Sequence, residues 1–201
     1  MVCLSNTLNA ALDDPISICG IRVSFLEDDL ASTTGNGQFL IESQGIDCEI
    51  YTIDGPPHDR SYFESQLAAL NTYFNSVSYG KFGIDLEGSD IYPLEQNSSY
   101  LLEQYMNYYN PYNEYELQEK RLTELFKDAS EKAYSQDQID FSNYDVIVVF
   151  LAGIGEDFSL PFLDPTPEDI PSTFVDNSMI LEHLSVSSIV IGDNMIDQGI
   201  I

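Results

Sequence analysis

Two histidines are the side chains around which hydrolytic chemistry in this 201-residue chain would have to be built. His58 lies in a polar turn after Gly55-Pro56-Pro57, and His183 lies in the segment 179–184. A Ser-His-Asp or Cys-His arrangement needs one of them as its base. We interpret His58 as a turn residue. We interpret His183 as a residue that caps or packs a short helix, and a ligand role is the alternative for it.

Neither histidine belongs to a zinc-binding motif. In H-E-x-x-H, positions four apart place both imidazoles on one helix face and the glutamate activates the zinc-bound water. The order here is Glu182-His183, and no histidine follows. The glycine-rich motifs GxGxxG and GxxxxGK[ST] are also absent. We therefore predict no catalytic residue, no metal ligand and no cofactor within this chain.

The charge of the chain restricts its partners. There are 34 acidic residues against seven basic ones, which gives a net charge of −27. Such a field repels phosphate backbones and anionic lipids, and no stretch approaches the roughly 20 apolar residues of a spanning helix. We predict no nucleic-acid partner and no membrane span. The acidity favours solubility; a calcium-binding surface is the alternative, although the D-x-[DN]-x-[DN]-G spacing does not occur.

The N-terminus and the cysteines raise the question of export. Residues 1–10 end in small residues, as at a signal-peptidase site, but lack a charged start. Residues 1–15 are therefore either a signal-peptide remnant or an ordinary disordered terminus. If the chain is exported, Cys19 and Cys48 are the natural disulfide pair, closing a loop of about 30 residues; otherwise they are two buried thiols.

Runs of β-branched and apolar residues predict the strands. The continuous apolar run 145–153 predicts a central strand that is covered on both faces. Residues 18–26 predict the first strand, and residues 188–192 predict the last one. Residues 39–41 with 48–53 predict a further strand or hairpin.

Helical periodicity and turn residues supply the rest of the pattern. An apolar stripe predicts a helix from Ser61 to Gly80, with Ser61 and Glu64 as a capping box. Residues 101–109 and 122–133 predict two more helices, and residues 82–87 alternate like a half-exposed strand. Four prolines predict that 158–174 is a surface loop.

These elements predict one α/β domain over residues 16–201, with a mixed twisted sheet and packing helices. Tyrosines gather between Tyr100 and Tyr115. A sugar- or peptide-binding surface is one interpretation of them, and we favour the other, which is amphipathic packing.

Three segments resemble the immune-inhibitor-A-like metallopeptidases, which are zincin-type enzymes. Residues 73–84 (YFNSVSYGKFGI) are similar to the segment "yF-x-x-[VS]-S-y-G-k-[lf]" of that family. Residues 141–157 (FSNYDVIVVFLAGIGED) resemble the strand and "aG-x-G-e" edge that precede the zinc helix, and residues 21–25 (IRVSF) resemble the opening strand. Order and spacing agree over about residues 18–157.

This resemblance implies a zincin-like N-terminal subdomain of an exported peptidase that acts on a peptide or protein. The segment Ala152, Gly153, Ile154 and Gly155 would lie near the edge where a peptide substrate adds as a strand. The family often carries a calcium-loop-like insertion before this strand, whereas Tyr144 runs directly into it. The zinc ligands and general base should follow the proline-rich loop, and the chain reaches Ile201 without them.

We therefore expect an incomplete metallopeptidase-like domain, truncated before its zinc helix, inactive alone, and secreted or at the cell surface. The apolar end at Ile200-Ile201 favours a gene fragment, and zinc is expected only for the full-length parent. The alternative is a non-catalytic secreted or cell-surface binding module with a degenerate peptidase fold. A third hypothesis is an acidic, calcium-dependent adhesion domain.

Overall fold

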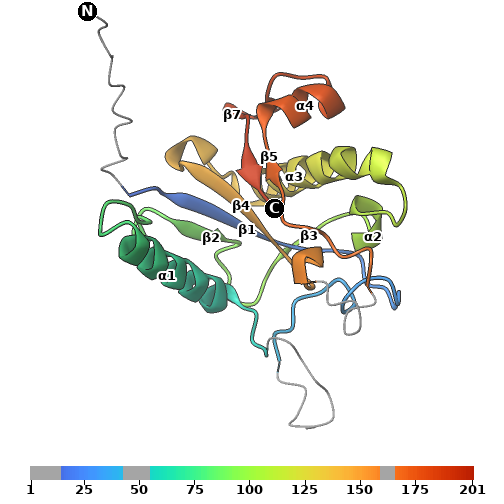
Figure 1. Cartoon of the computed structure of the whole chain (residues 1–201), viewed down its shortest axis with the longest axis horizontal. Helices are drawn as coiled ribbons and strands as arrows, with labels where there is room; N and C mark the ends of the chain where they lie inside the picture. The colour runs from blue at the N-terminus through green and yellow to red at the C-terminus, as the bar shows by residue number, and fades with distance from the viewer. Residues whose placement is uncertain (1–14, 43–54, 159–165) are drawn as a thin grey trace, which may run out of the picture.

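A twisted sheet with helices on both faces forms the centre of the molecule (Figure 1). The structure is a computed structural model that describes residues 15–42, 55–158 and 166–201. Its main sheet has the strand order β2-β1-β4-β8-β5, with β3 also paired to β1. The strands are β1 Ile18–Ser24, β2 Asp90–Tyr92, β3 Tyr100–Leu101, β4 Val146–Leu151, β5 Phe174–Val175 and β8 Gly199–Ile200.

The centre of the sheet is the parallel pair β1 and β4. Their register runs from Ile18 opposite Val146 to Val23 opposite Leu151. All seven residues of β1 are buried, and β4 pairs on its other side with β8. Within the described part of this sheet only β5 and β8 pair in antiparallel fashion, so the sheet is mixed. The predicted α/β class, the mixed sheet and the central position of the 145–153 strand are confirmed.

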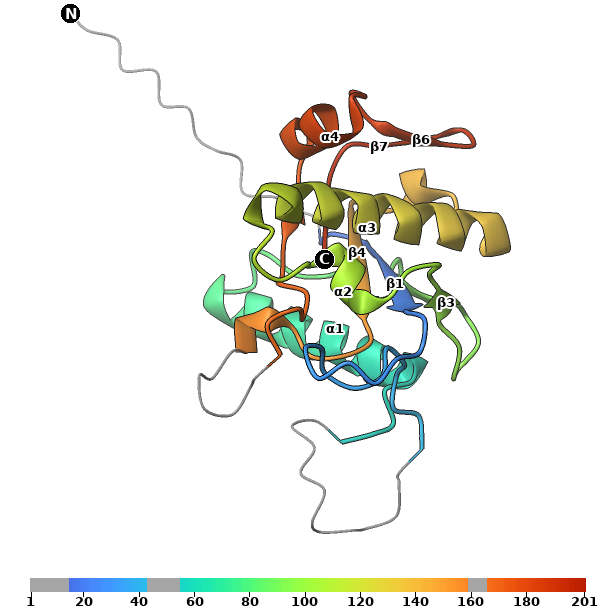
Figure 2. The same ribbon diagram turned by 90° about the vertical axis from the view of Figure 1, so that its right-hand side faces the viewer.

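Helices cover the two faces of this sheet. Helix α1 (Arg60–Val77) packs Phe63 and Leu67 on one face, and α3 (Tyr115–Asp137) buries Leu125 and Phe126 on the other. Helix α4 (Asn177–Leu184) and the separate β6–β7 hairpin (Ile189–Ile191 and Asn194–Ile196) lie on the outer side of α3 (Figure 2). A short helix, α2 (Met106–Tyr109), and two 3-10 turns, Phe141–Asn143 and Glu156–Phe158, complete the described elements.

Some element boundaries differ from the predictions for physical reasons. The α1 N-cap is Asp59, whose carboxylate accepts from the Tyr62 amide, so the predicted Ser61 capping box is wrong. Residues 82–87 form no strand, because Ile84 makes only an isolated bridge with Ile16. The predicted helix 101–109 is split, since the Leu102 amide donates to Ser24 and extends the pairing of β3 with β1.

The predicted second strand or hairpin falls partly beyond the described residues. Residues 39–41 form no strand, and residues 48–53 lie outside the described ranges. The Leu40 carbonyl instead accepts from the His58 amide at 2.7 Å. Tyr100 and Tyr109 are fully buried, so these two tyrosines pack in the core, as the preferred interpretation predicted. Across the described ranges, none of the helices has the length and apolarity needed to cross a bilayer.

Candidate functional site

The carboxyl edge of the sheet is the candidate site, because ligands of open α/β sheets bind beyond the carboxyl ends of the strands. The loop 25–42 follows β1, and the segment 152–158 follows β4. Residues 166–171 join them there: the Glu168 amide donates to Ser32 at 2.9 Å, and the Glu156 amide donates to Ile170 at 3.3 Å. The loop after β1 therefore meets two segments that lie more than 100 residues further along the chain, and we call this edge the carboxyl-edge site.

The buried carboxylate of Asp169 holds these segments together. Asp169 is fully buried, and its Oδ1 accepts from the Thr34 amide at 2.6 Å. Its Oδ2 accepts from the hydroxyls of Thr34 and Thr166 at 2.5 and 2.8 Å. The main-chain carbonyl of Asp169 accepts from Asn110 Nδ2 at 2.6 Å. We call Thr34, Asn110, Thr166 and Asp169 the Asp169 cluster.

The neighbouring Glu168 ties the same segment to two further places. Its Oε2 accepts from the Ser32 hydroxyl, and its Oε1 accepts from the Tyr112 amide at 3.1 Å. Tyr112 lies in the turn between α2 and α3. Glu168 thus attaches the proline-rich segment to the loop after β1 and to the turn before α3. Both of its carboxylate oxygens are used to hold these segments in place, so we assign Glu168 a positioning role and not proton transfer.

The predicted substrate edge lies beside the Asp169 cluster. Ala152 is buried, and its amide donates to Val23 at 3.0 Å, whereas Gly153 and Gly155 are exposed and Ile154 is half-buried. Gly153 has a φ of +110°, and a Cβ there would lie 2.6 Å from Met106 Cε. Only glycine fits this backbone without strain. The role of residues 152–155 in binding a substrate stays a prediction.

Helix α2, which brings Met106 to Gly153, is attached to α3 by a tyrosine. The Tyr109 hydroxyl donates to Asp128 Oδ2 at 2.9 Å. Burial raises the pKa of Asp128 above the ordinary aspartate value of 3.8, and burial likewise raises the pKa of Tyr109. The neutral carboxyl is therefore the better buried form, and ionisation of Asp128 costs stability.

This pKa shift predicts a pH dependence of stability. The raised pKa means that the folded state favours the protonated form of Asp128. The resulting contribution to stability is fully present below pH 3.8 and is lost as the pH rises through the raised pKa. Asp128→Asn keeps an acceptor for Tyr109 but removes the titration, so the variant should gain stability relative to the wild type as pH rises. Urea unfolding of both proteins from about pH 3.5 to about pH 8 would measure this difference. A difference that does not change with pH would contradict it.

The two histidines lie on opposite sides of the sheet and are not brought together. His58 precedes α1, and its ring packs on Tyr62 with centroids 5.0 Å apart. His183 lies in the last turn of α4, with Nε2 3.4 Å from Glu119 Oε2. Figure 2 shows α4 on the outer side of α3. The packing interpretation of His183 on a short helix agrees with this position. Within the described ranges, no three His, Cys, Asp or Glu side chains group as a metal site.

The predicted cysteine pair is only half described. Cys19 lies in β1 and is fully buried, and burial raises the pKa of its thiol. Cys48 lies outside the described residues, so the disulfide stays a prediction.

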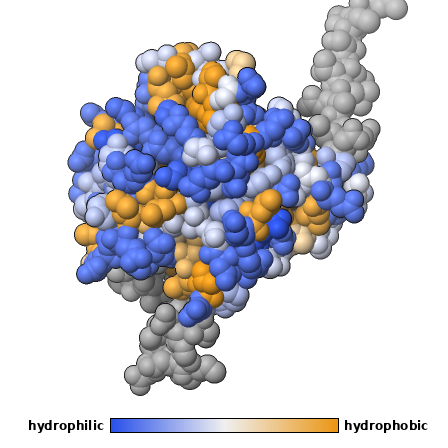
Figure 3. Space-filling model, turned by 180° about the vertical axis from the view of Figure 1, so that it is seen from behind, coloured by the Kyte–Doolittle hydropathy of each residue, from blue (hydrophilic) through white to orange (hydrophobic). Residues whose placement is uncertain are grey.

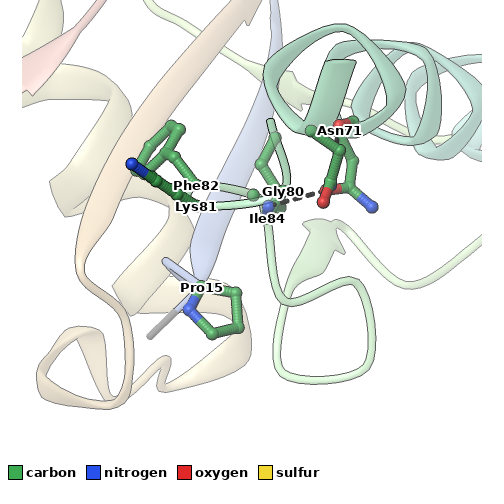
Figure 4. Close-up of a pocket in the computed structure, with 8 residues that line it drawn as sticks. Pro15, Asn71, Gly80, Lys81, Phe82 and Ile84 are labelled. Carbon is green, nitrogen blue, oxygen red and sulfur yellow. Dashed lines mark hydrogen bonds between the residues drawn. The ribbon is translucent and has the colours of Figure 1, made fainter. Parts of the chain in front are cut away.

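A hollow of about 270 Å³ lies at the opposite, amino end of the sheet (Figure 4). It is lined by Pro15, Asn71, Asn75 and residues 80–84. Asn71 Oδ1 accepts from the Ile84 amide at 2.9 Å and from Asn75 Nδ2 at 2.6 Å, so its amide oxygen holds the turn after α1. Among the residues that line the hollow, only Lys81 is charged. This arrangement serves packing of the turn better than catalysis.

No family model, curated protein or solved structure matches this chain. The interpretation of the carboxyl-edge site therefore depends on its own geometry and on the resemblance in the sequence.

The sequence pointed to only one segment at this edge, and the role of that segment stays a prediction. The resemblance pointed to residues 152–155, but nothing in it pointed to the Asp169 cluster. One signal was available, because Ile170 is an apolar residue within a proline-rich acidic loop and is buried. Asp169 beside it is buried as well, and a buried carboxylate requires hydrogen-bond partners.

Proposed function

We propose that this chain is the amino-terminal part of a secreted zinc metallopeptidase-like protein and is inactive alone. The observation that carries the proposal is the pairing of β1 with β4, which ends at the carboxyl edge in residues 152–155. Two of the three segments that resemble the immune-inhibitor-A-like peptidases are thus adjacent parallel strands.

The third segment supports the same proposal by its position. Residues 73–84 include the last residues of α1 and the turn that returns to the sheet, where Ile84 bridges Ile16 just before β1. All three segments therefore belong to the sheet or to the helix packed on it. Similarity spread over one connected layer is more informative than similarity at separate surface loops.

In this proposal the chain supplies a scaffold and a place for the substrate. The exposed backbone of Gly153 and Gly155 would pair with an extended peptide or protein substrate. The Asp169 cluster would hold that backbone in place from behind. The zinc ligands and the general base would come from residues that follow Ile201 in the parent protein, where zinc would activate the attacking water.

The codons that follow Ile201 in the gene test this proposal directly. We expect an H-E-x-x-H motif on a predicted helix within about 100 residues. Its absence from an open reading frame of that length would remove the proposal. A stop codon directly after Ile201 would remove it as well, because the parent would then lack any ligand set.

The second candidate function is a non-catalytic secreted or cell-surface binding module. It is favoured by the position of Met106 and the Thr34 carbonyl, which would lie 2.6 and 3.3 Å from a Cβ at Gly153 and so leave less room on that side of the predicted substrate edge. A downstream helix with apolar residues at both histidine positions would support this candidate over the first.

A further inference from the structure

The β6–β7 hairpin presents an exposed apolar surface outside the candidate site. Val190 and Met195 face each other across the hairpin and are 66% and 73% exposed. Leu181 on α4 and Val186 in the turn before β6 are exposed as well. Figure 2 places α4 and the hairpin together over α3, and Figure 3 shows hydrophobic surface at this upper end of the molecule. We call these four residues the hairpin surface.

Buried side chains and hydrogen bonds attach the β6–β7 hairpin to the core. Ile189, Ile191 and Ile196 are buried, so the two strands alternate between the core and solvent. Asn194 is also buried: its Oδ1 accepts from the Phe141 amide at 2.8 Å, and its Nδ2 donates to Ile191 at 3.1 Å. Val190 and Met195 are therefore presented on a rigid support, which lowers the entropy cost of binding.

The elements that carry the hairpin surface have acidic side chains and no lysine or arginine. Glu182, Asp193 and Asp197 are exposed beside it, and none of them takes part in the ion pairs found among the described residues. From residue 133 to residue 201 the sequence has 12 acidic residues and no lysine or arginine. An apolar centre with an acidic border is complementary to a segment that is apolar on one side and basic on the other.

We propose that the hairpin surface binds a cationic amphipathic segment of a partner protein. Val190 and Met195 would contact the apolar side of that segment, and Glu182, Asp193 and Asp197 would attract its lysines or arginines. A second copy of this chain fits less well, because two surfaces that carry the same acidic border repel each other. The proposal does not depend on the proposed peptidase relationship.

Fluorescence anisotropy with a defined probe tests this inference. The probe is a labelled synthetic amphipathic helix of lysine and leucine, about 18 residues long, titrated with the full chain. We expect Val190→Lys to weaken binding by about tenfold or more, because it removes apolar contact and repels the probe. Val77→Lys is the matched control, because Val77 is 54% exposed on α1 and the variant changes the net charge equally. It should bind within about twofold of the wild type.

Each other outcome of this titration overturns the proposal. Equal affinity of the two lysine variants would mean that the probe binds through the overall charge and not through the hairpin. A wild-type chain that does not bind the probe at low salt would exclude this partner chemistry. Light scattering that shows a dimer, lost in Val190→Lys, would assign the surface to a second copy instead. Circular dichroism of both variants checks that they fold.

Discussion

Replacing Asp169 by alanine should lower the free energy of unfolding by about 3 kcal/mol or more. The side chain is fully buried and accepts from the Thr34 amide, the Thr34 hydroxyl and the Thr166 hydroxyl. Without it, the Thr34 amide and the Thr34 and Thr166 hydroxyls lose this acceptor, and a buried donor left without an acceptor costs its desolvation free energy. Urea unfolding of the purified variant measures the change.

Two further variants separate this effect from a change of charge. Asp169→Asn keeps the shape and an Oδ1 acceptor for the Thr34 amide, and its Nδ2 can donate to the Thr34 or Thr166 hydroxyl, so it should cost only about 1 kcal/mol. Asp197→Ala removes an equal charge from an exposed position and should stay within about 0.5 kcal/mol of the wild type. If Asp169→Ala were as stable as Asp197→Ala, the Asp169 cluster would not hold the carboxyl edge together.

Gly199→Ala should destabilise the fold by about 2 kcal/mol, because β8 approaches α3 too closely for a side chain. A Cβ at Gly199 would overlap Cε2 and Cζ of Phe126, which is fully buried, and would lie 3.1 Å from the Ile147 carbonyl. Gly55→Ala is the matched control, since no described atom lies within 4 Å of a Cβ there. Thermal or urea unfolding of the two variants measures the difference.

A double-mutant cycle tests whether Phe126 is the cause. Phe126→Leu alone leaves a small cavity, but in combination with Gly199→Ala the added methyl group can occupy part of that space. We expect the two changes together to cost about 1 kcal/mol less than their sum. Simple additivity would show that Phe126 is not what excludes a side chain from Gly199.

The central part of the fold could be predicted because its strands and helices have sequence patterns that extend over many residues. The apolar run of β4 and the periodicity of α1 each extend over several residues, so the burial of their faces is visible in the sequence. Strands β5, β7 and β8 could not be predicted in the same way. They have two or three residues each, which is too short for a periodic pattern. Strands β5 and β8 also depend on contacts far along the chain, such as Phe174 opposite Ile200.

The candidate site likewise has one part that the sequence could place and one part that it could not. Residues 152–155 follow a strong strand and could be placed at its carboxyl end, whereas the Asp169 cluster needs the packing of three loops. Thr34, Asn110 and Asp169 are separated by 76 and 59 residues and are joined only by tertiary hydrogen bonds. In a chain with 34 acidic residues, no local feature distinguishes the buried carboxylate from the solvated ones.

The zinc content of two purified proteins tests the proposed function most directly. One is the 201-residue chain, and the other is the longer product that the proposal expects from the same gene, each measured by elemental analysis after dialysis. We expect no stoichiometric zinc in the first and about one equivalent in the second. About one equivalent in the 201-residue chain would mean that His58 or His183 binds metal, and zinc in neither protein would contradict a zinc metallopeptidase parent.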